Sequence, residues 1–251
     1  MKKNVTEFIT FLKQFTTLVS IQEHLFGLQL DFEYKNQVKS IFFHYIIPNT
    51  TTDLKKLNQN WIIWEDLWVN KKDIIKASIR AYFGQTKAIH GRKTIVKPVT
   101  TPIAKDFLIN NHLFSTSTGK FRLGLYFNED LVGLMTFSSG RNWKERVGKS
   151  YEIIRFCNHK DYRVHGGFSK LLNTFIQQKN PVQLMTYADT SWYQSSMYEQ
   201  QGFTCEHQNK VHSFFISPTY SDRQLTLIDP KDQQQWMKVV NYESYKFTWN
   251  A

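Results

Sequence analysis

The sequence predicts a mixed α/β chain with two domains. Some runs alternate between apolar and polar residues, as strands do. They are interspersed with runs whose apolar residues recur at helical spacing. Hydrophobic residues make up 41% of the 251 residues and aromatic residues 16%, which is enough for packed cores. A stretch that begins at Gly84 and ends at Gly91 separates the two halves. We expect a small α/β domain over residues 1–84, a mixed sheet with flanking helices over residues 92–216, and an aromatic tail over residues 217–251 that packs on the core.

The first half alternates between helices and strands. Lys35-Asn36-Gln37 is suited to a hairpin turn between two strands, and Gly84 is suited to end a helix. The expected elements, in order, are a helix over residues 5–19, strands over 25–34, 39–47 and 61–64, and a helix over 70–82.

The second half continues the alternation. Pro102 stands at a first helical position after an N-cap at Thr101, and Asn128-Glu129-Asp130 is a tight hairpin turn. The expected elements are a strand over residues 94–99, a helix from 101 to 112, strands over 121–127, 131–138 and 151–158, a helix over 166–178, a strand over 183–188, a helix near 195–201, and a hairpin over 203–216.

Charge and cysteine content narrow the class of function. The formal net charge of +11 favours polyanionic partners such as nucleic acid, although a basic protein without such a partner is the alternative. No apolar run approaches the ~18 residues of a membrane span, and Met1-Lys2-Lys3 does not open a signal peptide. Cys157 and Cys205 lack metal-ligand spacing, so we expect two buried thiols and no metal. Together with the lack of a membrane span and of a signal peptide, this predicts a cytoplasmic protein without a membrane partner.

A glycine turn at residues 163–170, Arg-Val-His-Gly-Gly-Phe-Ser-Lys, is the most informative part of the chain. A glycine turn that opens a helix directly after a strand points free backbone N–H groups at the space in front of it. Such a turn suits a phosphate or pyrophosphate. The alternative is a turn that only opens a packing helix.

Three further residues are candidates for catalysis. Tyr198 lies near the end of the last expected helix, and its phenol has an ordinary pKa near 10. Asp189 closes a strand at its carboxyl end, where ligand-facing residues gather in α/β folds. His112 follows a helix and can face an acceptor. Each has a structural alternative: a core aromatic, a helix cap and a structural histidine.

Two basic features of the second half call for partners. Arg155 lies inside an apolar strand and needs a partner such as Glu152 or Asp189. A basic loop combines charge with an aromatic ring, which nucleic-acid binding requires for phosphate and for base stacking; its residues are Arg141, Trp143, Lys144, Arg146 and Lys149. A solvated loop is the alternative.

The order of elements over residues 92–216 resembles the GNAT superfamily of acyltransferases. In that family an R/Q-x-x-G-x-G/A turn binds the pyrophosphate of coenzyme A. Arg163, Gly166 and Gly167 match its first, fourth and fifth places, whereas Phe168 stands at the sixth, where the family has Gly or Ala. The resemblance implies acetyl-CoA or a related acyl-CoA as donor, with Asn158 and Ser169 completing its site. It also implies that Tyr198 protonates the thiolate and that backbone N–H groups of 157–159 hold the carbonyl.

The two halves together resemble phage proteins in which a GNAT-like module follows a restriction-endonuclease-like domain of the very-short-patch-repair type. The run from Leu30 to Tyr34 resembles the first catalytic strand of that domain, and residues 61–76 its closing strand and helix. A second carboxylate is expected about eleven residues after Asp31, but Phe42 stands there, and one carboxylate cannot position Mg²⁺. We therefore expect a degenerate domain kept for DNA binding, unless Glu23 or Glu33 replaces the missing ligand.

These resemblances imply an acyltransferase that modifies a base amine of nucleic acid, DNA rather than RNA, as the Mom-type enzymes do. A base inside a duplex has to be flipped out for such chemistry. One alternative is a non-catalytic DNA-binding protein built from two degenerate modules. Another is an N-acyltransferase for small molecules or proteins.

Overall fold

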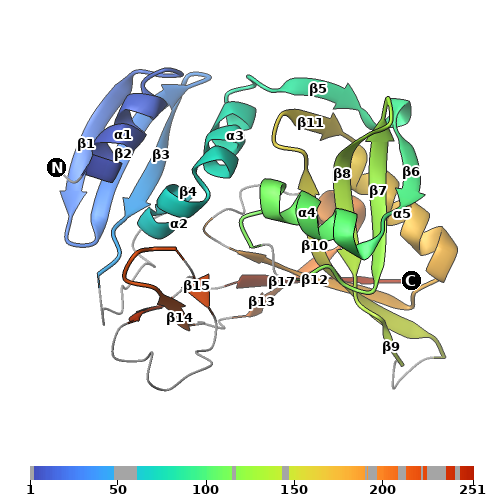
Figure 1. Cartoon of the computed structure of the whole chain (residues 1–251). Helices are drawn as coiled ribbons and strands as arrows, with labels where there is room; N and C mark the ends of the chain where they lie inside the picture. The colour runs from blue at the N-terminus through green and yellow to red at the C-terminus, as the bar shows by residue number, and fades with distance from the viewer. Residues whose placement is uncertain are drawn as a thin grey trace. The chain divides into compact units, whose positions relative to one another are not determined.

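The computed structural model shows an α/β protein whose chain divides into two compact units (Figure 1). The predicted class, with a mixed sheet and flanking helices, is confirmed. The first unit comprises residues 1–72, 188–195 and 208–245, and the second comprises 73–187, 196–207 and 246–251. The structure describes residues 3–47, 61–114, 117–142, 147–189, 191, 197–208, 213–221, 223–224, 236–240 and 244–251. Within these residues, no helix has the length and apolar character needed to cross a membrane.

A four-stranded sheet forms the centre of the first unit. Its strands lie in the order β1 (Leu18–His24), β2 (Gly27–Tyr34), β3 (Gln37–His44) and β4 (Trp61–Trp64). The first three are antiparallel and β4 runs parallel to β3. Lys35 and Asn36 have positive φ, as a two-residue hairpin turn requires, so the predicted turn is confirmed.

Two helices pack beside this sheet. Helix α1 (Lys3–Leu12) buries its apolar side, and the ring of Phe8 lies 5.1 Å from that of Phe43 on β3 and 5.0 Å from that of Trp68. Trp68 belongs to the short helix α2 (Glu65–Asn70), which directly follows β4. Aromatic contacts therefore join α1, α2 and the sheet.

A second, three-stranded sheet in the first unit corrects the hairpin expected over residues 203–216. Its order is β15 (Arg223–Gln224), β14 (Ser213–Ile216) and β16 (Met237–Val240), with both pairs antiparallel. Strand β13 (Thr204–Gln208) instead joins the large sheet beside β17 (Ser244–Asn250). The segment expected to be a tail thus supplies a strand of the large sheet.

The large sheet forms the centre of the second unit. Its order is β13-β17-β12-β10-β8-β7-β6, with β9 paired to β10. Strands β6 to β10 are antiparallel to their neighbours in this order, whereas β12 runs parallel to β10. The remaining bounds are β6 (Ile95–Pro98), β7 (Phe121–Phe127), β8 (Asp130–Phe137), β9 (Arg141–Asn142), β10 (Lys149–Asn158) and β12 (Gln183–Asp189).

Helices α4 (Thr101–Asn111) and α5 (Gly167–Lys179) cover opposite faces of this sheet (Figure 1). Ala104 of α4 belongs to an apolar cluster with Leu134 of β8. Phe175 of α5 stacks on Phe137 of the same strand, with ring centroids 3.5 Å apart. Because side chains alternate along a strand, Leu134 and Phe137 point to different faces. The N-cap of α4 is the residue before the predicted one, Thr100.

Smaller elements complete the second unit. Strand β5 (Lys87–His90) pairs in parallel with β11 (Tyr162–His165). Helix α3 (Lys72–Tyr82) precedes β5, and the 3₁₀ turn η2 (Gly91–Lys93) follows it. The helix expected near residues 195–201 is represented, within the described residues, by the 3₁₀ turn η3 (Glu199–Gln201).

Replacing Phe175 with alanine should lower the free energy of unfolding by about 3–5 kcal/mol, because it removes a buried ring stacked on Phe137 and leaves a cavity. Gln178→Ala, on the exposed side of the same helix, is the matched control and should stay within about 0.5 kcal/mol of wild type. Urea denaturation of the three proteins measures both effects. Equal stabilities of the two variants would contradict the packing described here.

Candidate functional site

Strands β10 and β12 pair over three residues and then continue without pairing. Their register joins Ser150–Glu152 to Gln183–Met185, and no further pair joins them within the described part of the chain. β10 continues along β8, with a register shift after Ile153. Residues 154–158 are all half-buried although the strand is central to the sheet. The edge of β10 that faces β12 is therefore open beyond Ile153.

The two glycines before α5 have different structural requirements. Gly166 is the N-cap, and its φ of +71° lies in the left-handed region that favours glycine. A Cβ at Gly166 would meet nothing within 4 Å, so this side of the turn is open. A Cβ at Gly167 would lie 2.8 Å from Leu125 and 3.0 Å from Val164. Packing against the sheet thus requires the second glycine, and backbone conformation favours the first.

The first turn of α5 leaves backbone N–H groups unused. No side-chain cap is present among the described residues, and the first helical bond runs from the N–H of Lys170 to the carbonyl of Gly166 at 3.0 Å. The N–H groups of residues 167–169, including the predicted Ser169, face out of the helix N-terminus. The partial positive charge of the helix favours an anion there.

Basic side chains surround the glycine turn. β11 places Arg163 beside Ala88 and His165 beside His90, and the two histidine rings lie 6.0 Å apart. Arg163 donates a 3.4 Å hydrogen bond to the carbonyl of Ala81 and is otherwise exposed. The exposed basic residues of β5, η2 and β11 are Lys87, His90, Arg92, Lys93, Arg163 and His165. This charge adds to the attraction of the helix for an anion.

Asn158 ends β10 with an unused acceptor. Its buried Oδ1 has no hydrogen-bond partner in the part of the chain that the structure describes. A buried acceptor without a donor costs about 1–3 kcal/mol, so this atom suits an amide N–H brought by a ligand. The N–H of His159, which sequence analysis included among the carbonyl-binding groups, is instead taken by the carbonyl of Val132 at 2.9 Å.

An aromatic column spans the open edge between β10 and β12. We define it as Phe156 of β10, Phe168 of α5, Tyr198 and Phe247 of β17. Successive ring centroids lie 5.0, 5.4 and 4.8 Å apart. Phe168, only 5% exposed, stands between the open part of β10 and Tyr198. The phenylalanine at this place therefore puts a buried ring beside the predicted catalytic tyrosine.

Tyr198 is held at the point where the strands separate. Its phenol is hydrogen-bonded to Thr186 of β12, and the Thr186 hydroxyl donates to the carbonyl of Ile153 at 3.0 Å. Burial raises the pKa of Tyr198, while the hydrogen bond to Thr186 acts in the opposite direction. The phenol is therefore protonated at neutral pH, which is the state that a proton donor needs.

The other two candidate catalytic residues make structural contacts. Asp189 belongs to the first unit, where its Oδ1 accepts the N–H of Ser191 at 2.8 Å in the manner of a turn cap. Burial raises its pKa, and that hydrogen bond and the charge of Arg223 oppose the rise. His112 caps the C-terminus of α4, and its Nδ1 accepts the N–H of Phe114 at 2.9 Å. Catalytic roles for both stay predictions.

The predicted basic loop begins and ends in strands. Arg141 of β9 pairs with Ser150 of β10, and Asn142 pairs with Lys149. Arg141 and Lys149 are both exposed. The other three predicted residues, Trp143, Lys144 and Arg146, lie outside the described residues. A nucleic-acid interface here stays a prediction.

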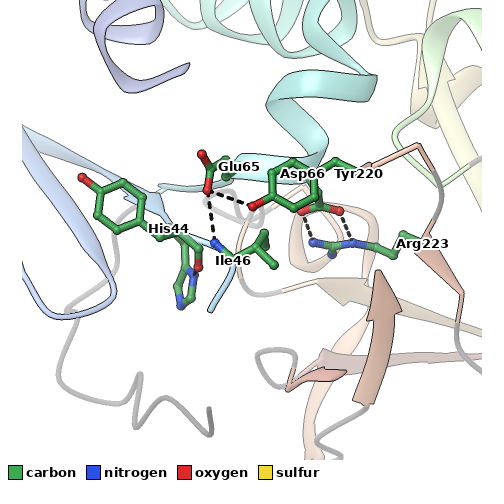
Figure 2. Close-up of polar contacts among 7 residues, drawn as sticks. His44, Ile46, Glu65, Asp66, Tyr220 and Arg223 are labelled. Atoms are coloured by element: carbon green, nitrogen blue, oxygen red, sulfur yellow. Dashed lines mark hydrogen bonds and ion pairs between the residues drawn. The ribbon is translucent and has the colours of Figure 1, made fainter. Parts of the chain in front are cut away.

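A buried ion pair lies in the first unit (Figure 2). Arg223 of β15 donates to both carboxylate oxygens of Asp66, at 2.8 and 2.6 Å. Its guanidinium carbon also lies 5.1 Å from the ring centroids of Trp64 and Phe214. Sequence analysis missed this pair. Its only sign in the sequence is two adjacent carboxylates within the apolar run of β4 and α2.

Glu65, His44 and Tyr220 extend this buried cluster (Figure 2). Glu65 accepts the N–H of Ile46 at 3.3 Å and the hydroxyl of Tyr220 at 3.5 Å. His44 is 1% exposed, and its Nδ1 lies 2.6 Å from the carbonyl of Tyr45, so Nδ1 carries the proton of the neutral ring. Burial lowers the pKa of His44 to about 4, and the charge of Arg223 contributes.

Asp31, the remaining carboxylate of the nuclease-like comparison, contacts neutral groups. It accepts hydrogen bonds from Ser20 and Ser40, both at 2.6 Å, and from Gln29 and Gln22 at 2.9 and 3.3 Å. Burial alone would raise the pKa of Asp31, but these hydrogen bonds outweigh it and hold the pKa below its ordinary value. Among the described residues, no three His, Cys, Asp or Glu side chains gather to hold a metal.

No protein-family model matches the sequence, and no curated protein matches it. Solved structures that are similar to it include the following three. A GNAT family acetyltransferase from Elizabethkingia anophelis with acetyl-CoA bound has a TM-score of 0.42 and 14% identity, covering 63% of this chain and 99% of that one. The NatC complex bound to Gag peptide and CoA has a TM-score of 0.39 and 13% identity, with 63% and 99% covered. A mutant agmatine N-acetyltransferase in its apo form has a TM-score of 0.37 and 10% identity, with 63% and 100% covered. At such low similarity, what this chain does has to be inferred from its own residues.

Lowering the pH should destabilise the protein through His44. Its pKa falls from 6.5 in the unfolded chain to about 4 in the folded protein, so the unfolded state binds the proton more tightly and stability is lost as the pH falls from 6.5 towards 4. Between pH 7.5 and pH 5 this effect amounts to about 2 kcal/mol.

His44→Asn removes this titration and serves as the control for the other groups that protonate in acid. Urea denaturation at the two pH values should show a larger loss for wild type than for the variant. Equal losses would mean that His44 does not titrate in this way.

Proposed function

We propose that this chain is an N-acyltransferase that moves an acyl group from an acyl-CoA to an amine. The arrangement of the open edge of β10 carries the proposal. This edge has the uncapped glycine turn of α5 at one side and the phenol of Tyr198 at the point where β12 departs. An anion site, an exposed strand edge and a protonated acid are the three components that such a transfer needs.

The residues of this site fit an acyl-CoA donor. The N–H groups of residues 167–169 and the basic side chain of Arg163 would hold its pyrophosphate. The Oδ1 of Asn158, which has no hydrogen-bond partner among the described residues, would accept an amide N–H. When bound, the donor supplies a thioester carbonyl for the amine to attack.

Tyr198 would act as the general acid. The raised pKa of this phenol keeps it protonated, and Thr186 fixes its position through a hydrogen bond. Its proton would go to the thiolate sulfur as the C–S bond breaks, and the proton that the amine loses as the amide C–N bond forms would restore the phenol. Phe168 and Phe247 pack against the ring of Tyr198.

The acceptor that we propose is an amine of a nucleic-acid base, in DNA rather than in RNA. The formal net charge of +11 supports it, because a basic surface concentrates polyanions. In this proposal the first unit is a degenerate nuclease-like module that binds DNA, and the order of its helix and strands together with Asp31 supports that assignment. An amine on a small molecule or on a protein is the competing acceptor.

A second candidate function is binding of DNA without catalysis. The ring of Phe168, which stands between the open edge of β10 and Tyr198, favours it, because a donor has to share that space. Binding of acyl-CoA separates the two candidates, since a purely DNA-binding protein has no use for the donor.

Gly166→Asp should weaken acetyl-CoA binding more than tenfold, because it places a carboxylate in front of the uncapped N–H groups. The side chain has room there, and aspartate tolerates positive φ better than most residues. Gly166→Asn is the matched neutral control and should bind within a few-fold of wild type. Isothermal titration calorimetry measures all three proteins. Equal weakening by both substitutions would indicate steric exclusion. If neither substitution weakens binding, the donor binds elsewhere.

Tyr198→Phe should lower kcat for acyl transfer by about 10²–10⁴-fold, because the phenolic proton is removed while the ring contacts remain. The KM for the donor should stay near that of wild type. Tyr126→Phe, which removes a phenol on the α4 side of β7, is the control and should leave kcat unchanged.

The acceptor can be identified with the same variant. Mass spectrometry of nucleosides from cells that express wild type or Tyr198→Phe should show an acylated nucleoside with wild type alone. Activity on small amines without such a nucleoside would overturn the nucleic-acid assignment and leave the acyltransferase in place.

A further inference from the structure

Three polar residues form one row across the large sheet. Arg122 of β7 lies opposite Thr136 of β8, and Thr136 lies opposite Arg155 of β10. Residues directly opposite in antiparallel strands point to the same face, and a strand spacing of ~4.8 Å puts the two arginine backbones about 10 Å apart. The next row contains Leu134 and Cys157, which pack in the apolar cluster under α4. The arginine row therefore lies on the α4 face, beside the end of that cluster.

Arg155 is paired with backbone carbonyls rather than with Glu152 or Asp189. Its Nε donates to the carbonyl of Phe114 at 2.7 Å, and its Nη1 to that of Ile154 at 2.6 Å. Within the described residues no carboxylate lies at ion-pair distance, and Nη2 makes no hydrogen bond. Burial holds the pKa of Arg155 below its ordinary value, although the charge of Glu152 opposes this.

Arg122 repeats this arrangement. Its Nε donates to the carbonyl of Val99 at 3.0 Å, and its Nη1 to that of Gly119 at 2.7 Å. It too has no carboxylate at ion-pair distance and no hydrogen bond at Nη2 in the described part of the chain. Phe114 and Gly119 lie at the two ends of one short segment after α4. The two guanidinium groups therefore bind carbonyls that lie five residues apart in the chain.

The hydroxyl between the two arginines is also unused. Thr136 is fully buried, and its Oγ1 has no hydrogen-bond partner among the described residues. A buried hydroxyl without a partner and two half-buried cations without a carboxylate are each unfavourable. An oxyanion is a suitable partner for these groups, because the outer nitrogens of a guanidinium bind carboxylate and phosphate with matching geometry and a hydroxyl can donate to the same group.

We propose that Arg122, Thr136 and Arg155 bind an anionic group of the acceptor, either a phosphate or a carboxylate. The assignment of the anion to the acceptor rests on the function proposed above. The anion site itself does not depend on that function. The glycine turn opens α5, which covers the other face of the sheet. Donor and acceptor then approach from opposite faces and meet at the open edge of β10, which carries Arg155 itself.

Nuclear magnetic resonance of the arginine side chains tests the site without any need for activity. The full-length protein is first saturated with coenzyme A, so that the glycine turn is occupied, and then titrated with inorganic phosphate and, separately, with acetate. The Nε–H signals of Arg122 and Arg155 are assigned by their absence in Arg122→Lys and Arg155→Lys. Both signals should move together and saturate, whereas that of the exposed Arg80 should not.

Arg155→Met should weaken phosphate binding, read at Arg122, by about tenfold or more, and Arg80→Met should leave it unchanged. A stronger response to phosphate assigns a phosphorylated acceptor, and a stronger response to acetate assigns a carboxylated one. Signals that stay still, or that move in parallel with Arg80, overturn the proposal and leave the arginines as tethers of the segment after α4.

The two proposals fail separately in this experiment. If coenzyme A does not shift the amide signals of residues 167–169, the donor site is wrong, and the phosphate titration still tests the arginine row. With an active enzyme, deoxyadenosine and its 5′-monophosphate form a matched pair of acceptors. The monophosphate should have the lower KM with wild type, and Arg155→Met should abolish that difference in KM.

Discussion

The site of this protein depends on the point at which β12 stops pairing with β10. From Ser150 to Glu152 the strand β10 pairs with β12, and beyond Glu152 it pairs with β8 alone in the described part of the chain. The Thr186 hydroxyl donates to the carbonyl of Ile153, the first residue after the two strands separate. Thr186 is also hydrogen-bonded to the phenol of Tyr198 and so positions it. A strand with one free edge in the middle of a sheet is unfavourable unless something pairs with it. The free edge is therefore the feature that most directly indicates a bound ligand.

The glycine turn is rigid because it is tied to an element distant in sequence. Lys170 donates from its Nζ to the carbonyls of Gly91 and Thr94, and the Thr94 hydroxyl donates to the carbonyl of Gly91 as well. A Cβ at Gly91 would lie 3.0 Å from the carbonyl of His165, so the 3₁₀ turn η2 approaches the glycine turn closely. These contacts fix the direction of the free N–H groups before any anion arrives, which lowers the ordering cost of binding.

Local features were predictable from the sequence, and long-range pairings were not. The strand over residues 121–127, the turns at Lys35 and Asn128 and the opening of α5 at Gly166 each follow from residues near one another in the chain. The partner of β13 could not be predicted, because about 35 residues separate it from β17 and nothing local marks the pairing.

The same limit applies to side chains. The pair of Asp66 with Arg223 joins residues far apart in sequence, and the row of Arg122, Thr136 and Arg155 becomes visible only once the registers of three strands are known. Asp189 was identified by its place at a strand end, a position that equally suits a turn cap, and the structure shows the cap. Tyr198 and Gly166 were predicted from short local patterns, and their functional roles stay predictions.

The route of the chain through its two units has a consequence for dissecting the protein. The chain passes between the units five times, and its last seven described strand residues, 244–250, insert β17 between β12 and β13. No single cut therefore releases either unit whole: a fragment that ends before residue 244 lacks an interior strand of the large sheet, and one that begins after residue 72 lacks the four-stranded sheet. During synthesis, too, β13 cannot pair within the large sheet until β17 has left the ribosome. Neither unit corresponds to one continuous stretch of the chain.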